Sequence, residues 1–169
     1  MSVDWSEVYR TTYASIVRFI HRQVWDEDRA HDLAQEAFVR SLPHEPENPR
    51  AWVFRIASNL VRDEAKMVVR RKKHLALLRT EQEAVAPAPA EPDAELDRKE
   101  REERVRRALA ALTDRDREVL LLWDAGLGYA EIAAQTGLAP GAVGTTLSRA
   151  RKKLVASYDA LEETDAARG

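Results

Sequence analysis

Apolar residues recur every three or four positions through most of the chain, which is the spacing of helices that bury one face. The first such stretch covers residues 4–24. A second begins near residue 26 and ends before Pro43, because proline disrupts a helix interior. A third begins at Asn48, which can cap a helix whose first residue is proline, and continues to about Leu78.

The second half of the chain shows the same periodicity in shorter pieces. Thr113 can cap a helix, with Asp116 as the acidic partner of a capping box. We expect four helices here, over residues 96–112, 113–126, 129–135 and 141 to about 158. A short helix, a turn containing Gly137 and a longer helix are typical of a helix-turn-helix. An ordinary helical hairpin is the alternative.

The two halves are separated by residues 81–95, which contain five acids, no base and an alternation of alanine and proline. Such a segment favours an extended path and cannot bury an apolar face. No alternating β-branched run indicates a strand. The predicted fold is therefore all-α, with two small helical domains joined by a flexible acidic linker. Their ranges are 1–80 (the first block), the linker 81–95, 96–160 (the second block) and a tail, 161–169.

Charge is segregated along the chain although the total is nearly neutral. The sequence has 27 Lys and Arg against 29 Asp and Glu, a formal net charge of −2. That balance argues against gripping nucleic acid by bulk charge. Residues 66–79, however, carry six bases and no acid, and residues 149–153 carry four bases. Local contact with DNA therefore remains compatible with the composition.

Other classes of protein are disfavoured by what the sequence contains. There is no cysteine, which removes disulfides, thiolate nucleophiles and cysteine-ligated zinc, and we expect no cofactor or bound metal. The N-terminus does not resemble a signal peptide, and no apolar run approaches the roughly 20 residues of a membrane span. We expect a cytoplasmic protein without membrane insertion of its own.

The third helix has two distinct faces. One face is apolar and gathers Val53, Ile56, Ala57 and Leu60. The other face, called here the basic stripe, carries Arg55, Asn59, Arg62, Lys66 and Lys73, with Arg70 adjacent. At about 1.5 Å per residue the stripe is roughly 25 Å long, which suits a phosphate backbone. A solvated surface is the alternative explanation for such a run of cations.

Three segments, in this order, carry a family resemblance. They are DLAQEAFVR at 32–40, AWVFRIASNLVRD at 51–63, and residues 112–154 with their LSRARKKL ending. The chain resembles the bacterial RNA polymerase sigma factors of the small extracytoplasmic-function (ECF) type, within the sigma-70 family. The resemblance implies a non-enzymatic transcription initiation factor that binds core RNA polymerase, recognises the −10 and −35 promoter elements and promotes DNA opening.

The resemblance also assigns roles to residues. The outer face of the second helix would bind core polymerase, through Asp32, Gln35, Glu36, Val39 and Arg40. On the third helix Asn59 would contact an unstacked base of the −10 element, while phosphates or the strand edge would be held by Arg55, Arg62, Lys66, Arg70 and Arg71. The last helix would read the bases of the −35 element with Thr145, Ser148 and Arg149. It would contact the DNA backbone with Arg151, Lys152 and Lys153. An anti-sigma protein is an expected partner.

Two departures from the family pattern bear on these roles. Gly144, Thr145 and Thr146 stand where many relatives have a basic residue and a Ser-Arg pair. We hypothesise that Gly144 permits close approach of the backbone to DNA. Where the family has an arginine-rich turn, residues 66–69 contain one lysine and three apolar residues. The −10 roles of the residues after Asn59 therefore match the family pattern less closely than that of Asn59.

Two other functions compete with this one. A polymerase-independent helix-turn-helix regulator would leave the N-terminal motifs unexplained and would need a dimer interface or sensor. A metal-dependent helical-bundle enzyme could use His21, His31, Asp32 and Glu36, but matched Glu-x-x-His sets are missing.

Trp52 and Phe54 could stack on bases, although their position beside apolar residues favours packing.

Overall fold

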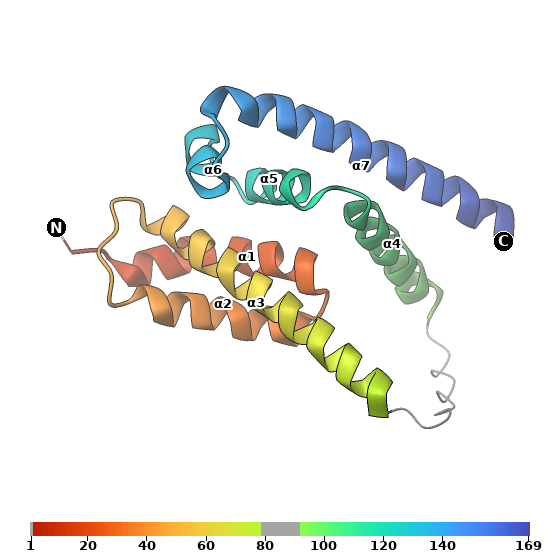
Figure 1. Cartoon of the computed structure of the whole chain (residues 1–169), viewed down its shortest axis with the longest axis horizontal. Helices are drawn as coiled ribbons and strands as arrows, with labels where there is room; N and C mark the ends of the chain where they lie inside the picture. The colour runs from red at the N-terminus through yellow and green to blue at the C-terminus, as the bar shows by residue number, and fades with distance from the viewer. Residues whose placement is uncertain (1, 79–91) are drawn as a thin grey trace.

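The computed structural model describes residues 2–78 and 92–169, which form two stacked groups of helices (Figure 1). Helices α1 to α3 pack on one another and make up the first block, and α5 and α6 pack against α7, as does α4, to make up the second. Among the described residues the helices are α1 (Trp5–Val24), α2 (Glu27–Ser41), α3 (Pro49–Leu78), α4 (Asp93–Ala110), α5 (Asp114–Asp124), α6 (Tyr129–Thr136) and α7 (Pro140–Arg168). The all-α prediction is confirmed.

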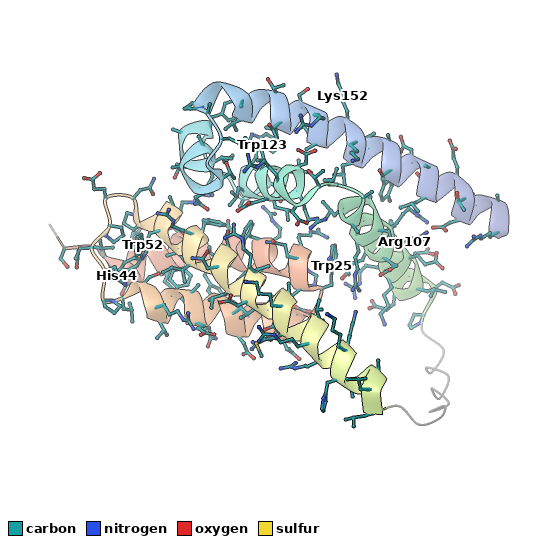
Figure 2. All side chains as sticks on the ribbon, in the orientation of Figure 1. Trp25, His44, Trp52, Arg107, Trp123 and Lys152 are labelled. Carbon is teal, nitrogen blue, oxygen red and sulfur yellow. The ribbon has the colours of Figure 1, made fainter. Side chains whose placement is uncertain are left out.

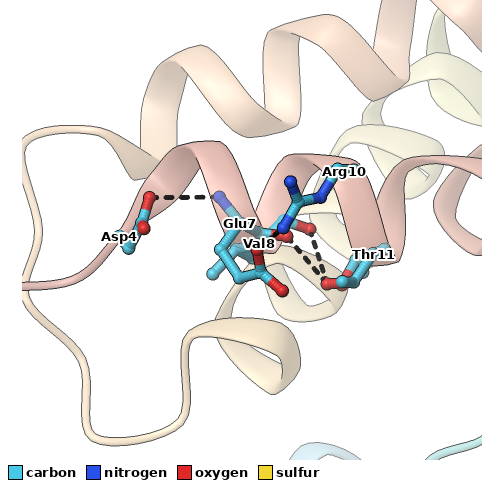
Figure 3. Close-up of polar contacts among 6 residues, drawn as sticks. Asp4, Glu7, Val8, Arg10 and Thr11 are labelled. Carbon is cyan, nitrogen blue, oxygen red and sulfur yellow. Dashed lines mark hydrogen bonds and ion pairs between the residues drawn. The ribbon is translucent and has the colours of Figure 1, made fainter.

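Side-chain caps fix where the first two helices begin. Asp4 accepts a hydrogen bond from the backbone N–H of Glu7 at 3.1 Å, and Thr11 donates to the Glu7 carbonyl at 2.9 Å (Figure 3). Glu7 also pairs with Arg10 one turn later. Asp26 caps α2 in the same way as Asp4 caps α1. These caps satisfy backbone donors that a helix leaves unpaired at its N-terminus.

The first block has an apolar core and an ion pair that joins α2 to α3. Ile16, Ile20 and Phe54 are completely buried, so Phe54 is a packing residue as expected. Arg29 of α2 donates to both carboxylate oxygens of Glu64 on α3, at 2.9 and 2.7 Å, and this hydrogen bonding lowers the pKa of Glu64. Beyond this pair α3 leaves the bundle, and residues 65–78 are all exposed (Figure 1).

The second block is built around the first half of α7. Val143, Leu147 and Ala150 are buried there, on the face that the sequence predicted, and Thr113 caps α5. Gly137 ends α6 with a positive φ of 76°, a left-handed conformation that glycine adopts without strain. The short helix, tight turn and long helix of a helix-turn-helix are therefore present.

Two predicted boundaries are wrong. Helix α4 begins at Asp93, inside the range predicted as linker, because acids in its first turn favour a helix N-terminus and Glu95 pairs with Arg98 at 2.5 Å. Residues 81–91 of the predicted linker lie outside the described residues. Helix α7 does not end near residue 158 but includes most of the predicted tail. There Asp165 accepts a hydrogen bond from Arg104 of α4 at 3.2 Å.

Candidate functional site

The outer face of α2 is exposed as predicted and combines acidic, amide and apolar side chains. Asp32, Gln35, Val39 and Arg40 are exposed, and Glu36 is half-buried. Val39 is 64% exposed although it is purely apolar. Arg40 pairs with Glu36 at 2.5 Å, so the positive charge of Arg40 is partly neutralised within the helix. An exposed valine framed by acceptors suits a protein partner with basic and apolar groups.

The basic stripe of α3 lies on the opposite side from its buried face, and Arg55, Asn59, Arg62 and Lys66 are all exposed. Arg62 donates to the Asn59 side-chain oxygen at 3.0 Å and to the Glu118 carboxylate of α5 at 2.8 Å. The amide expected to meet a base is therefore already oriented by its neighbour. In addition, a carboxylate of the second block occupies one side of the Arg62 guanidinium.

A small cavity of about 270 Å³ lies at this point between the blocks. The first block contributes Arg55, Ser58, Asn59 and Arg62 to its lining, and the second block contributes Glu118 and Gln135. The Ser58 hydroxyl is buried and, among the described residues, has no hydrogen-bond partner. The predicted −10 residues Arg70 and Arg71 belong to the exposed stretch 65–78 of α3 and do not line this cavity. The structure therefore divides the predicted −10 set between two places.

The exposed face of α7 brings most of the predicted −35 residues together. Thr145, Ser148, Arg149, Lys152 and Lys153 line one open hollow of about 840 Å³ with Gly144. Figure 2 shows Lys152 on the side of α7 that faces away from the first block. Arg151 is different, because its guanidinium lies 3.7 Å from the ring centroid of Trp123 on α5. A cation–π contact of this kind fixes Arg151 against α5.

Arg149 makes the strongest contact on this face. Its guanidinium donates to both Asp116 oxygens, at 2.7 and 3.4 Å, and hydrogen bonding to Arg149 lowers the pKa of Asp116. The Asp116 side chain is 4% exposed and the Arg149 side chain 62%. The capping-box prediction is correct for Thr113, which accepts from the Asp116 N–H at 3.2 Å. The Asp116 carboxylate, however, pairs with Arg149, so Asp116 links α5 to the predicted reading helix.

Gly144 lies beside α6. A Cβ built on Gly144 would be 3.4 Å from Cε2 of Tyr129, an ordinary contact distance. The fold therefore tolerates alanine at this position, and close packing within the protein does not require glycine. The hypothesis that DNA requires it stays a prediction.

The residues of the competing metal site have other roles. Tyr13 and His31 share a hydrogen bond of 2.9 Å between the hydroxyl and Nδ1, and burial raises the pKa of Tyr13. Within residues 2–78 and 92–169, no three His, Asp or Glu side chains are grouped so that they could hold a metal ion. No helix in the same ranges has the length and apolar character needed to cross a bilayer.

Sequence reasoning missed the side chains that connect elements distant in the chain. Glu118 looks like one more acid on an amphipathic helix, and Arg50 like one more surface base near a helix start. Their partners are Arg62 and the carbonyls at the end of α5. The one local signal was the alternation of acids and bases over residues 114–118, which indicates that α5 forms ion pairs.

Comparison with known proteins gives matches over both blocks. The family description "Sigma-70 region 2" matches residues 8–72, and "Sigma-70, region 4" matches residues 102–154. The RNA polymerase sigma factor YlaC of Bacillus subtilis is 30% identical over 159 residues, covering 88% of each chain. The ECF RNA polymerase sigma factor EcfG of Rhodopseudomonas palustris is 34% identical over 137 residues, covering 76% of this chain and 71% of the relative.

Solved structures agree with the fold. The sigma factor RpoE of Bartonella quintana, in complex with the anti-sigma factor NepR, superimposes with a TM-score of 0.66 at 23% identity, covering 92% of this chain and 97% of the other. CnrH, in complex with the cytosolic domain of CnrY, gives a TM-score of 0.65 at 25% identity, covering 92% and 88%.

Proposed function

The chain belongs to the sigma-70 family of RNA polymerase sigma factors, in its ECF group, and on that premise we propose how its surfaces divide the work of promoter recognition. A sigma factor directs core RNA polymerase to promoters. The observation that carries the proposal is that three exposed polar faces, on α2, α3 and α7, each lie opposite a buried stripe within the two matched regions.

The outer face of α2 would dock on core polymerase. Asp32, Gln35 and Glu36 offer acceptors to a basic partner, and exposed Val39 offers an apolar contact beside them. We expect Val39→Glu to reduce co-purification with core polymerase at least tenfold, because it buries a charge in the contact. Val155→Glu is the matched control, since Val155 is 58% exposed on α7, outside the proposed surface. Equal binding by both variants would exclude this surface.

The basic stripe of α3 would capture the opened −10 element. Asn59 has an amide that suits a base edge, and Arg55, Arg62 and Lys66 place cations along the same face, with Arg70 and Arg71 further out. No catalytic side chain is needed, because binding of the single strand offsets the lost base stacking. Figure 1 shows that the outer half of α3 projects beyond α1 and α2, where a strand can reach it.

The exposed face of α7 would read the −35 element. Thr145, Ser148 and Arg149 line one hollow together with Lys152 and Lys153, which would hold the phosphates. Asp116 holds the Arg149 guanidinium in a fixed direction while leaving most of it exposed. The second block thus supplies closed-complex recognition, and the first block supplies opening.

Run-off transcription with core polymerase separates the two steps. Asn59→Ala should impair open-complex formation more than closed-complex binding, since it removes a contact made only to unstacked bases. Ser148→Ala should weaken closed-complex binding on duplex promoter, as should Arg149→Lys, which keeps a cation beside Asp116. Equal losses at both steps from all three variants would contradict the division of labour.

A polymerase-independent regulator is the second candidate, and DNA affinity without polymerase distinguishes it. A sigma factor should bind promoter DNA weakly alone, whereas a repressor should bind with a Kd of about 10⁻⁸ M or tighter. We also propose control by an anti-sigma protein, as the family resemblance implies, and the relative RpoE was solved with such a partner. Co-purification from the native host tests both partners at once.

A further inference from the structure

Polar contacts between the two blocks lie mainly on α5 and α6, with one more on α4, where a Glu102 oxygen lies 3.7 Å from His21 Nε2 of α1, and they run mostly in one direction. Arginines of the first block donate to acceptors of the second. Arg18 of α1 donates to the Asp124 carbonyl at 3.3 Å, and Arg62 of α3 to Glu118 at 2.8 Å. Arg50 donates to the carbonyls of Ala125 and Gly126, at 2.5 and 3.2 Å. The C-terminal end of α5, where a helix dipole favours cations, is thus capped by the other block.

Gly126 makes the Arg50 contact possible. Its φ of +95° is a conformation that other residues rarely adopt, and a Cβ here would lie 2.7 Å from an Arg50 guanidinium nitrogen. The turn after α5 therefore suits Arg50 in both backbone shape and space. The contact of Arg50 with this turn adds to the ion pair between Arg62 and Glu118.

Helix α6 adds two further contacts with the start of α3. Asn48 donates to Glu131 at 2.8 Å, and Gln135 donates to the Ala51 carbonyl at 3.0 Å. Together with the contacts of Arg18, Arg50 and Arg62 they form one interface, called here the interblock interface. It lies along the N-terminal half of α3, beside Asn59.

We infer that this interface holds the free protein in a self-inhibited state, in which Glu118 takes the position on Arg62 that a DNA phosphate would otherwise occupy. The inference rests on the proposed role of the basic stripe in binding the opened strand. A carboxylate and a phosphate compete for the same guanidinium because both are anions that accept charge-assisted hydrogen bonds, and Glu118 accepts one from Arg62 here. A strand reaching Asn59 would also meet Glu118 and Gln135 across the 270 Å³ cavity.

The ion pairs of the interface are weak. They are partly exposed, with Arg62 55% and Glu118 23% exposed, so each contributes little and weakens as salt rises. Separating the blocks leaves each polar group free to meet water. The interblock interface does not include α2. Docking of α2 on polymerase therefore does not itself separate the blocks, and we expect them to separate when polymerase binds the second block at a different position.

Fluorescence energy transfer in the full chain tests the closed state directly. The sequence has no cysteine, so dyes can be placed at Asp28→Cys on α2 and Ala156→Cys on α7, both exposed and outside the interface. We expect Glu118→Lys to lower the transfer efficiency, because it sets a cation against Arg62, and Arg62→Glu to lower it as well. The charge swap Arg62→Glu with Glu118→Arg should restore it. Unchanged transfer in both single variants would overturn the inference.

A second measurement asks whether Glu118 blocks the stripe. Glu118→Gln and Glu103→Gln change the net charge equally, and Glu103 of α4 pairs with Arg106 of the same helix at 3.9 Å. Relative to Glu103→Gln, Glu118→Gln should bind a labelled single-stranded oligothymidine about threefold more tightly, since more of the population is competent to bind. Equal affinity would overturn the blocking role.

Core polymerase separates failure of this inference from failure of the proposed function. Added to the labelled wild-type chain, core enzyme should lower the transfer efficiency as the blocks part. If core enzyme does not bind, the proposed function fails while the free variants still decide the inference. If it binds and the transfer efficiency stays at the free value, the closed arrangement is compatible with binding and is not inhibitory.

Discussion

Arg62 and Arg149 lie on the two helices proposed to meet DNA, and α5 holds both of them by carboxylates two residues apart. Asp116 pairs with Arg149 inside the second block and is 4% exposed, whereas Glu118 reaches across to Arg62 and is 23% exposed. The buried carboxylate depends on its arginine, since an unpaired buried charge is costly. The partly exposed carboxylate of Glu118 does not depend on Arg62 in this way. The same chemistry thus stabilises a domain in one place and makes a reversible contact in the other.

The largest effect on stability should come from removing Arg149, the exposed partner of buried Asp116. Arg149→Ala leaves the Asp116 carboxylate buried without its cation, and we expect a loss of about 2 to 3 kcal/mol in unfolding free energy. Urea denaturation of the full chain measures it. Lys152→Ala, on the same helix and in no salt bridge within the described residues, is the control and should change stability by less than about 0.5 kcal/mol.

Lowering the pH should also reduce stability, because it protonates the paired carboxylates. Hydrogen bonding to Arg149 lowers the pKa of Asp116, and hydrogen bonding to Arg29 lowers that of Glu64. A carboxylate whose folded pKa is depressed contributes stability that is complete above its unfolded pKa and is lost as pH falls through the folded value. Stability should therefore decline below the ordinary values of 3.8 for Asp and 4.5 for Glu. Asp116→Asn should be less stable at neutral pH and show a flatter acid profile in urea titrations.

Gly144→Ala should act in the opposite direction. Alanine favours a helix interior over glycine by up to about 1 kcal/mol, and its methyl group would meet Tyr129 at 3.4 Å without a clash. Thermal melts should show the gain. If binding of duplex promoter by the polymerase complex is unchanged in this variant, the hypothesis that Gly144 admits the DNA backbone is wrong.

The smallest effect on stability should come from the exposed pair. Glu118→Gln should change the unfolding free energy by less than about 0.5 kcal/mol, because partly exposed ion pairs contribute little. Comparison with Asp116→Asn under identical conditions sharpens the contrast between the two carboxylates of α5. A loss as large as that of Asp116→Asn would show that the interblock contact is a structural element and that α5 holds both arginines in the same way.

Local patterns were enough to predict the helices and their buried faces. Val143, Leu147 and Ala150 are buried because they share one side of α7, and Arg55 and Asn59 are exposed because they share the other side of α3. The start of α4 at Asp93 was missed although the acids of its first turn act locally, whereas the end of α7 near residue 168 was missed because it depends on a partner from another helix. Asp165 gains Arg104 from α4, a contact that no local pattern contains.

The sequence by itself determined the seven helical segments, the two blocks and the exposed faces of α2, α3 and α7, since periodicity and caps act within a few residues. Tertiary structure alone decided which acid meets which base. Asp116 and Glu118 look alike in the sequence, yet one lies under Arg149 and the other opposite Arg62. Burial and partner choice arise only when distant helices pack, and they separate a stabilising contact from a reversible one.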